Sequence, residues 1–172
     1  MTKKEFLKSI SNGKEDILQQ ILNLLKTEKV KYCLIGGLAV NAYTEPVVSL
    51  DLDIVVVAEA IEGLIAAAKK IFKVEKFPHS YNLSSKKSDL RIQIQTDSRY
   101  QAFIERAAIK EVMGYEMSVA SLEDVLQGKI WAYSDEQRRK SKRQKDLADI
   151  YRLVETYPQL KKKIPESIKL NF

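Results

Sequence analysis

Two short stretches decide the fold, LIGGLAVN at residues 34–41 and LDLDIV at residues 50–55. Residues 30–35 have the apolar, β-branched character of a short buried strand, and Gly36 and Gly37 interrupt it before a short helix predicted over residues 38–43. Residues 50–57 predict a second strand, rich in isoleucine and valine, which carries Asp51 and Asp53 at its start. A strand, a glycine turn, a helix and a second strand therefore follow one another closely.

These residue types in this order favour a site for a metal ion and a phosphate. Glycine lets the backbone turn tightly and approach a ligand, and free N–H groups at the start of a helix can bind phosphate. Asp51 and Asp53 are two residues apart on a strand, so both carboxylates project from one face. Such a pair repels itself unless a cation neutralises it, and Mg²⁺ prefers one or two carboxylates together with substrate phosphates. Alone, each motif is usually a turn or exposed charge, but their combination predicts a nucleotide–metal site on Gly36, Gly37, Asp51 and Asp53.

Further elements are predicted outward from this centre. The patterns indicate strands near residues 74–77, 81–84 and 90–96, and a hairpin formed by residues 111–112 and 116–119. They indicate helices over residues 14–26, 58–72 and 121–133, and a long last helix from residue 134 or 135 to about residue 157. The tail after Pro158 is expected at the surface. We therefore predict an α+β fold with a mixed sheet, divided into a core of residues 1–120 and a helical extension of residues 121–172 that packs on it as one unit.

Composition and charge narrow the class of protein. The chain has 172 residues, a formal net charge of +6 and one cysteine, Cys33, which we expect in the core. The apolar runs at residues 54–57 and 64–68 are far shorter than the roughly 20 residues that span a bilayer, and the N-terminal residues lack the apolar centre of a signal peptide. We therefore expect a cytoplasmic protein without a membrane segment, whose basic balance favours anionic partners.

A cluster of basic residues lies on the predicted last helix. Arg138, Lys142, Lys145 and Asp149 fall on one stripe at three- to four-residue spacing, and Lys145 is placed to pair with Asp149. Such a stripe is either solvated or a surface for nucleotide phosphates or an RNA acceptor. Lys129 sits at the edge of the apolar face of the preceding helix, where it either snorkels to solvent or reaches a cleft.

These motifs together resemble a known family. Gly36-Gly37 followed by Asp51-Leu52-Asp53 between apolar residues resembles the signature of the nucleotidyltransferase superfamily. The later residues resemble its bacterial branch of AbiEii-type abortive-infection toxins and related nucleotidyltransferases, in which a lysine on one helix precedes a basic helix with the pattern Lys-Asp-x-x-Asp. Here these are Lys129 and the sequence KDLAD at residues 145–149.

The resemblance implies an enzyme that transfers a nucleoside monophosphate from an NTP to an unidentified RNA, protein or small-molecule acceptor. It implies that Asp51 and Asp53 are catalytic and hold Mg²⁺ or Mn²⁺, and that Lys129 is catalytic and contacts the triphosphate. Nucleotide binding would further involve Gly36, Gly37, Lys145 and Asp146. The basic helix from Arg138 to Lys145 would offer a surface to an RNA acceptor, and a role in a toxin–antitoxin pair would bring a cognate partner protein.

The sequence departs from the family pattern at the third carboxylate, which usually lies on a later strand. On the strand predicted over residues 90–96, Gln93 occupies that place, and an amide cannot serve as a general base. Either Asp97 or Asp89 supplies the carboxylate, or two carboxylates suffice, or the protein binds nucleotide without turnover. The alternatives to an enzyme are therefore a non-catalytic nucleotide-binding module, such as an antitoxin or regulator, and a nucleic-acid-binding domain that uses the basic helix.

Overall fold

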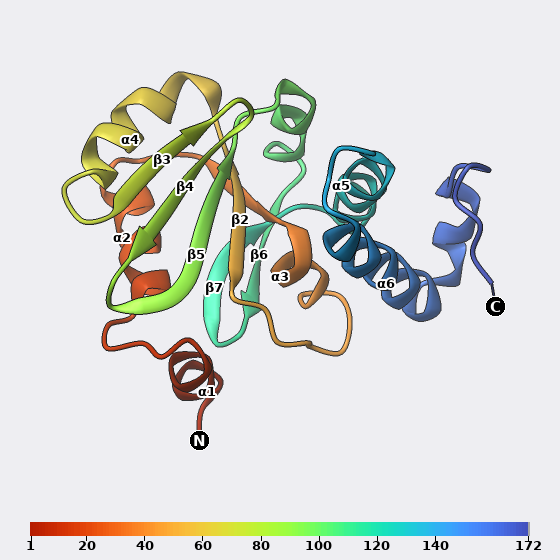
Figure 1. The fold of residues 1–172 in the computed structure, drawn as a ribbon, viewed down its shortest axis with the longest axis horizontal. Coiled ribbons are helices and arrows are strands. Elements are labelled where there is room, and N and C mark those ends of the chain that lie inside the picture. The colour runs from red at the N-terminus through yellow and green to blue at the C-terminus, as the bar shows by residue number, and fades with distance from the viewer. Residues whose placement is uncertain (172) are drawn as a thin grey trace.

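The computed structural model of the chain describes residues 1–171. Within them one mixed sheet has seven strands in the order β3-β4-β5-β2-β1-β7-β6 (Figure 1). The strands are β1 Tyr32–Ile35, β2 Asp51–Val56, β3 Lys73–Phe77, β4 Ser80–Ser85, β5 Ser88–Gln95, β6 Ala108–Val112 and β7 Tyr115–Val119. The central strand β2 runs antiparallel to β1 and parallel to β5, which places Asp51 and Asp53 between two neighbouring strands.

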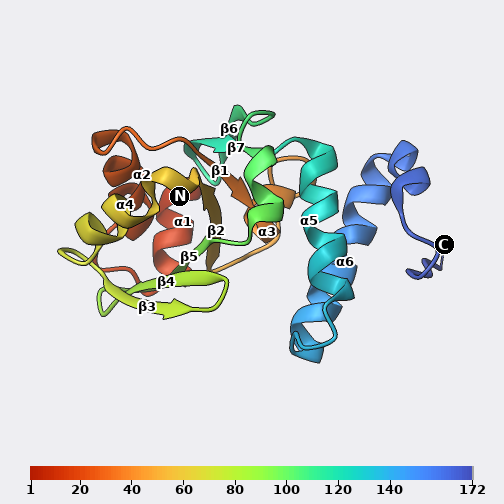
Figure 2. The ribbon, with the colours of Figure 1, turned by 90° about the horizontal axis from the view of Figure 1, so that it is seen from above.

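The helices lie in two groups on either side of the sheet's centre. The first group is α1 Lys3–Ile10, α2 Ile17–Thr27 and α4 Ile61–Ala68; the second is α3 Gly36–Val40, α5 Leu122–Ser134 and α6 Lys140–Thr156. Both ribbon views show α5 and α6 side by side at the end of the molecule away from α2 and α4 (Figures 1 and 2). Short 3₁₀ helices cover Ala58–Ala60, Ser98–Phe103 and Pro158–Lys163. No helix among residues 1–171 is both long enough and apolar enough to cross a membrane.

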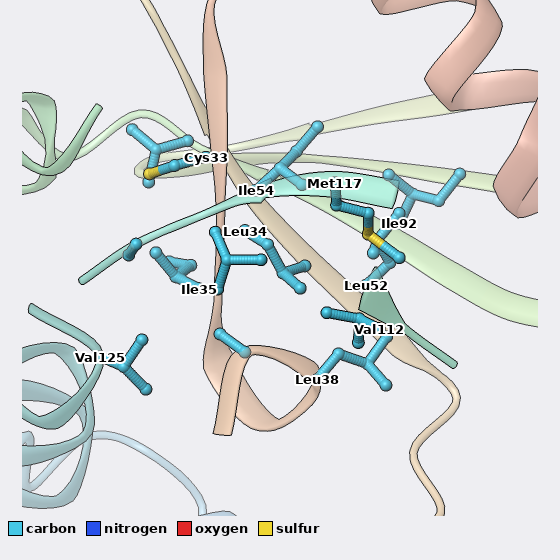
Figure 3. Packing of buried hydrophobic residues seen from close by; sticks show 14 of the residues in the cluster. Cys33, Leu34, Ile35, Leu38, Leu52, Ile54, Ile92, Val112, Met117 and Val125 are labelled. Carbon is cyan, nitrogen blue, oxygen red and sulfur yellow. The ribbon is translucent and has the colours of Figure 1, made fainter. Parts of the chain in front are cut away.

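The core forms where the apolar faces of these elements meet. Leu34 of β1, Ile54 of β2, Ile92 of β5 and Met117 of β7 are almost fully buried, and Figure 3 shows their side chains close together. Burial of each such side chain contributes roughly 1.5–3 kcal/mol. Cys33 is also buried, so its predicted core position is confirmed.

The strands follow the local patterns of the sequence closely. In β5 the apolar residues Leu90, Ile92 and Ile94 are buried while the residues between them face the other side, as the period of two predicts. The hairpin around Gly114 forms as β6 and β7. Helix α5 begins as expected, because the Ser121 hydroxyl accepts a hydrogen bond from the backbone N–H of Asp124 at 3.2 Å.

Some predicted boundaries are wrong. The last helix begins at Lys140, not at residue 134 or 135, because Asp135 caps a separate turn. Its carboxylate accepts a hydrogen bond from the N–H of Gln137, and its backbone carbonyl accepts one from Arg138. Gly36 and Gly37 are the first residues of α3 and do not precede it. Helix α1 was not predicted, and the division of the chain at residue 120 stays a prediction.

The expectation that the tail after Pro158 lies at the surface is wrong for two side chains. Leu160 and Ile168 retain only 2% and 5% of their exposed area, whereas the lysines between them are exposed. The tail therefore turns back and covers apolar surface next to α6.

We predict that Leu160→Ala lowers the free energy of unfolding by about 2–3 kcal/mol, because it removes a buried side chain and leaves a cavity. Lys162→Ala, two residues away and exposed, should change it by less than about 0.5 kcal/mol. Chemical denaturation of the two variants measures the difference, and equal stabilities would show that the tail does not contribute to the core.

Candidate active site

A single cavity brings together residues from β2, β5, α3, α5 and α6. Of the residues that the sequence marked as site candidates, those lining it are Gly36, Gly37, Asp51, Asp53, Gln93, Lys129, Lys145 and Asp146. The two sequence motifs, which lie far apart in the chain, therefore face the same space. Asp97 is not among the lining residues.

Asp51 lies at the start of β2 with both carboxylate oxygens engaged by cations. Arg91 Nε lies 2.8 Å from Asp51 Oδ1, and Lys142 Nζ lies 3.3 Å from Asp51 Oδ2. Burial alone would raise the pKa of Asp51, but Lys142 and Arg91 outweigh it and hold the pKa below its usual value. Asp51 is therefore ionised at neutral pH.

Asp53 lies deeper on the same face of β2, between Ile35 of β1 and Gln93 of β5. Burial raises the pKa of Asp53 to about 6, and the charge of Asp51 adds to this effect, while Lys129 and Arg138 partly offset it. The ionised form of Asp53 is therefore costly in the protein alone, and a nearby cation would stabilise it.

The position of Gly36 next to Asp53 requires glycine for two independent reasons. Its φ is +74°, in the left-handed region that side chains rarely adopt. A Cβ at this position would also overlap the carboxylate of Asp53. Gly37 differs, because a Cβ there would meet only Ser49 Oγ and Asp149 Oδ2, each at 3.8 Å, which is ordinary contact. Gly36 is thus fixed by the fold, whereas the open space at Gly37 belongs to the cavity.

Lys129 of α5 is buried in a cluster with two aspartates of α6. Its Nζ lies 3.0 Å from Asp146 Oδ1 and 2.8 Å from Asp149 Oδ2, and its side chain is only 9% exposed. Burial alone would lower the pKa of Lys129, but Asp149 and Asp146 outweigh it and raise the pKa above its usual value. Lys129 therefore stays protonated and does not snorkel to solvent.

The aspartates of this cluster have partners on both oxygens. Arg138 Nε lies 2.7 Å from Asp146 Oδ2, and Arg152 Nη1 lies 2.8 Å from Asp149 Oδ1. The expected pair of Lys145 with Asp149 does not form, because Lys129 and Arg152 take that carboxylate. Lys145 lines the cavity, and no ion pair joins it to another of residues 1–171.

The basic stripe predicted from the sequence, with Arg138 just before α6 and Lys142 and Lys145 on it, is therefore not simply solvated. Arg138 and Lys142 point their charges at Asp146 and Asp51, and Arg143 Nε donates a hydrogen bond to the backbone carbonyl of Tyr133 at 2.7 Å. Much of the positive charge on this helix is turned toward the cavity.

The position of the third carboxylate holds an amide. Gln93 lies directly beside Asp53 in the register of β5 with β2. Asp97 lies beyond the end of β5, where its carboxylate caps a 3₁₀ helix and pairs with Arg99 at 2.9 Å, and Asp89 also lies outside the cavity. Neither carboxylate lines the cavity in this structure. No group of three or more acidic, histidine or cysteine side chains among residues 1–171 is arranged to hold a metal ion.

Asp51 and Asp53 fit a divalent cation nonetheless. Mg²⁺ commonly takes one or two carboxylates from the protein and completes its shell with substrate phosphates and water. Two carboxylates on one face of β2, lining a cavity with several cations, match that donor set.

Sequence reasoning missed two residues with direct contacts at the site. Arg91 is two residues before Gln93 on β5, so the sequence period predicts that both side chains lie on the same face of the sheet. Its pairing with Asp51, however, depends on the register of two strands. Arg152 follows the Lys-Asp-x-x-Asp pattern by three residues, and no local signal indicates its contacts with the loop after α3.

Comparisons with known proteins show the family and the fold of this chain. The family model described as nucleotidyl transferase AbiEii toxin, Type IV TA system, matches residues 17–170. No sequence among the curated proteins matches the chain.

Solved structures share the fold at low identity. ANT(2'')-Ia in complex with adenylyl-2''-tobramycin is 16% identical with a TM-score of 0.62, over 86% of this chain and 91% of that one. The lincomycin-bound lincosamide antibiotic adenylyltransferase LnuA is 18% identical with a TM-score of 0.57, over 82% and 98%. An antigenic nucleotidyltransferase-like protein from Paracoccidioides brasiliensis is 17% identical with a TM-score of 0.53, over 90% and 78%. The predicted fold class and resemblance are confirmed.

We predict that Gly36→Ala and Gly37→Ala differ sharply in stability. Gly36→Ala should lower the free energy of unfolding by roughly 1–3 kcal/mol, because it combines a strained φ with overlap onto Asp53. Gly37→Ala should leave stability unchanged or raise it by up to about 1 kcal/mol, because it adds only ordinary contacts and alanine favours the helix over glycine. Thermal denaturation of both variants checks this, and a similar loss in both would contradict it.

A second prediction concerns Asp53 in metal-free protein. Because the pKa of Asp53 is raised from 3.8 to about 6, its ionisation makes folding less favourable as pH rises from about 4 to 6, and the loss then persists at higher pH. In the presence of a chelator, Asp53→Asn should therefore be more stable than the unchanged protein at pH 8, by on the order of 1–3 kcal/mol. The advantage should shrink toward pH 4. Denaturation curves at both pH values test this, and an advantage that does not depend on pH would contradict it.

Proposed function

The chain belongs to the AbiEii nucleotidyl transferase toxin family, and we propose that it transfers a nucleoside monophosphate from an NTP to an acceptor hydroxyl with the help of Mg²⁺ or Mn²⁺. Membership of a family of nucleotidyl transferases agrees with the expectation of an enzyme. The observation that carries the proposal is the convergence of Asp51, Asp53, Gly37 and Lys129 on one cavity.

Asp51 and Asp53 would hold the divalent cation. When bound, such an ion neutralises the phosphate oxygens and makes the phosphorus more open to attack. Arg91 and Lys142 neutralise Asp51, so Asp51 would have to exchange at least one of these partners to hold a cation. Lys142, if released from Asp51, would offer its charge to a phosphate group.

The triphosphate finds cations on two helices. Lys129 is buried and protonated, while Lys142 and Lys145 line the cavity from α6. The open space at Gly37 lets a phosphate approach the backbone closely. Asp146 acts through its neighbours, because both of its oxygens are held by Lys129 and Arg138. We therefore assign Asp146 a positioning role in nucleotide binding.

The proposed step forms one bond and breaks one. The acceptor oxygen attacks the α-phosphorus, the bond from that phosphorus to the bridging oxygen breaks, and pyrophosphate leaves with the electron pair. The acceptor proton passes to a cavity carboxylate or to water, because the amide of Gln93 cannot take it. Gln93 lies beside Asp53 in the sheet, and its amide would orient the acceptor hydroxyl by a hydrogen bond.

A second candidate function is a module that binds nucleotide without turnover. The specific observation in its favour is Gln93 at the third-carboxylate position, with Asp97 and Asp89 outside the cavity. Binding would use the same cations and carboxylates, so only a transfer assay separates the two functions.

The biological setting is also a proposal. The family description supports a toxin with a cognate antitoxin as its partner. A cytoplasmic location is part of the proposal, since the one cysteine, Cys33, is free and buried. The exposed basic residues Arg139 and Lys140 at the start of α6, close to the cavity-facing Arg138 and Lys142, support an RNA acceptor.

We predict that the purified protein transfers label from at least one α-labelled NTP to a component of total RNA or lysate with Mg²⁺ or Mn²⁺. Asp51→Asn and Asp53→Asn should each lower transfer at least 100-fold, because each removes a charge that the metal needs. Charge reversal at Arg139 should weaken transfer only to an RNA acceptor. Metal-dependent NTP binding without any transfer would favour the non-catalytic module, and the absence of both would contradict the proposed function.

A further inference from the structure

The cavity has one apolar wall that the proposed reaction does not yet use. Val47 and Val48, in the loop between α3 and β2, line the cavity and keep 54% and 51% of their area exposed. Exposed neighbouring apolar side chains at the edge of a charged cavity indicate a ligand with an apolar part.

The loop is held rigidly although its valines are exposed. The Asn41 side chain binds the backbone of Val47 twice: Nδ2 donates to the carbonyl at 2.7 Å, and Oδ1 accepts from the N–H at 3.0 Å. Arg152 Nη2 donates to Asn41 Oδ1 at 2.9 Å and to the carbonyl of Glu45 at 2.6 Å. These bonds fix the backbone of the loop at Glu45 and Val47 before any ligand arrives, which lowers the entropy cost of binding.

The same arginine joins this wall to the charged part of the cavity. Arg152 Nη1 binds one oxygen of Asp149, and Lys129 binds the other. On the other side of the valines, Ser49 lies beside Gly37, since a Cβ there would be 3.8 Å from Ser49 Oγ. The apolar wall therefore adjoins the place where the proposed triphosphate meets the backbone.

We propose that Val47 and Val48 form the nucleobase subsite, with the flat face of the base packed on the two isopropyl groups. This inference rests on the proposed function. A nucleotide combines a triphosphate, which matches Lys129, Lys142 and Lys145, with a planar base whose faces are apolar, which matches the wall.

The wall contributes affinity and does not select the base. Valine side chains have no hydrogen-bonding groups, and the Asn41 carbonyl oxygen is already taken by Val47 and Arg152. Loss of the wall therefore weakens binding of every NTP by a similar factor.

The acceptor is a poorer fit for this wall. In the proposed reaction Gln93 on β5 would orient the acceptor hydroxyl, whereas the valines belong to the loop that precedes β2, whose Ser49 lies near Gly37. In the proposed pose, a nucleotide with its phosphates at Gly37 has its base next to that loop.

The test measures binding of ATP, GTP, CTP and UTP and, separately, of inorganic tripolyphosphate, each with Mg²⁺, by calorimetry. The double variant Val47→Ser/Val48→Ser should lose about tenfold in affinity for each NTP, because apolar contact with the base is removed. Its affinity for tripolyphosphate should stay within about twofold, because the phosphate-binding cations are untouched. Val47→Leu/Val48→Leu keeps the wall apolar and should retain NTP affinity.

Ile109→Ser is the matched control, because Ile109 is 68% exposed on β6 and does not line the cavity. It should leave both affinities unchanged. If the double serine variant binds NTPs normally, or loses NTP and tripolyphosphate equally, the valines are not a base subsite. If the unchanged protein binds neither ligand, the proposed function fails and this inference fails with it.

Discussion

The site depends on the need to balance two carboxylates on one face of a central, largely buried strand. Asp51 and Asp53 would repel each other there without cations. Arg91 and Lys142 form ion pairs with Asp51. Lys129 and Arg138 favour the ionised form of Asp53 by electrostatic attraction. Three of these four cations, Lys129, Arg138 and Lys142, come from the segment that carries α5 and α6. That segment therefore has to pack close to the start of β2, where the two aspartates lie. The position of the helical part thus follows from charge as well as from apolar contact.

Two of these cations, Lys129 and Arg138, form ion pairs with aspartates of α6. Lys129 lies between Asp146 and Asp149, and each aspartate has an arginine on its outer oxygen. A buried ion cluster contributes little net stability, because desolvation offsets the attraction, but removal of one member leaves an uncompensated charge. We interpret the cluster as a device that sets how α5 and α6 lie against each other and keeps Lys129 protonated at the cavity.

The acceptor side of the proposed site differs from the family pattern. An amide occupies the place of the third acid, and the nearby carboxylates of β5 and its following turn point elsewhere. A two-carboxylate donor set leaves most of the shell of a metal ion to phosphates and water. Under the proposed function the nucleotide would be part of the metal site, and the cations of α6 would be as important for binding as the aspartates of β2.

Local patterns in the sequence determined the strands, the hairpin and the start of α5, because each depends on a period or a cap within a few residues. A short motif singled out Gly36, Gly37, Asp51 and Asp53, and the family resemblance added Lys129; all five line the cavity. Only the tertiary structure decided the partners of Asp149, the absence of Asp97 from the cavity and the burial of Leu160. It also decided that Val47 and Val48 form a wall. These features depend on which distant segments meet, and that is set by strand register and helix packing over the whole chain, which no local period records.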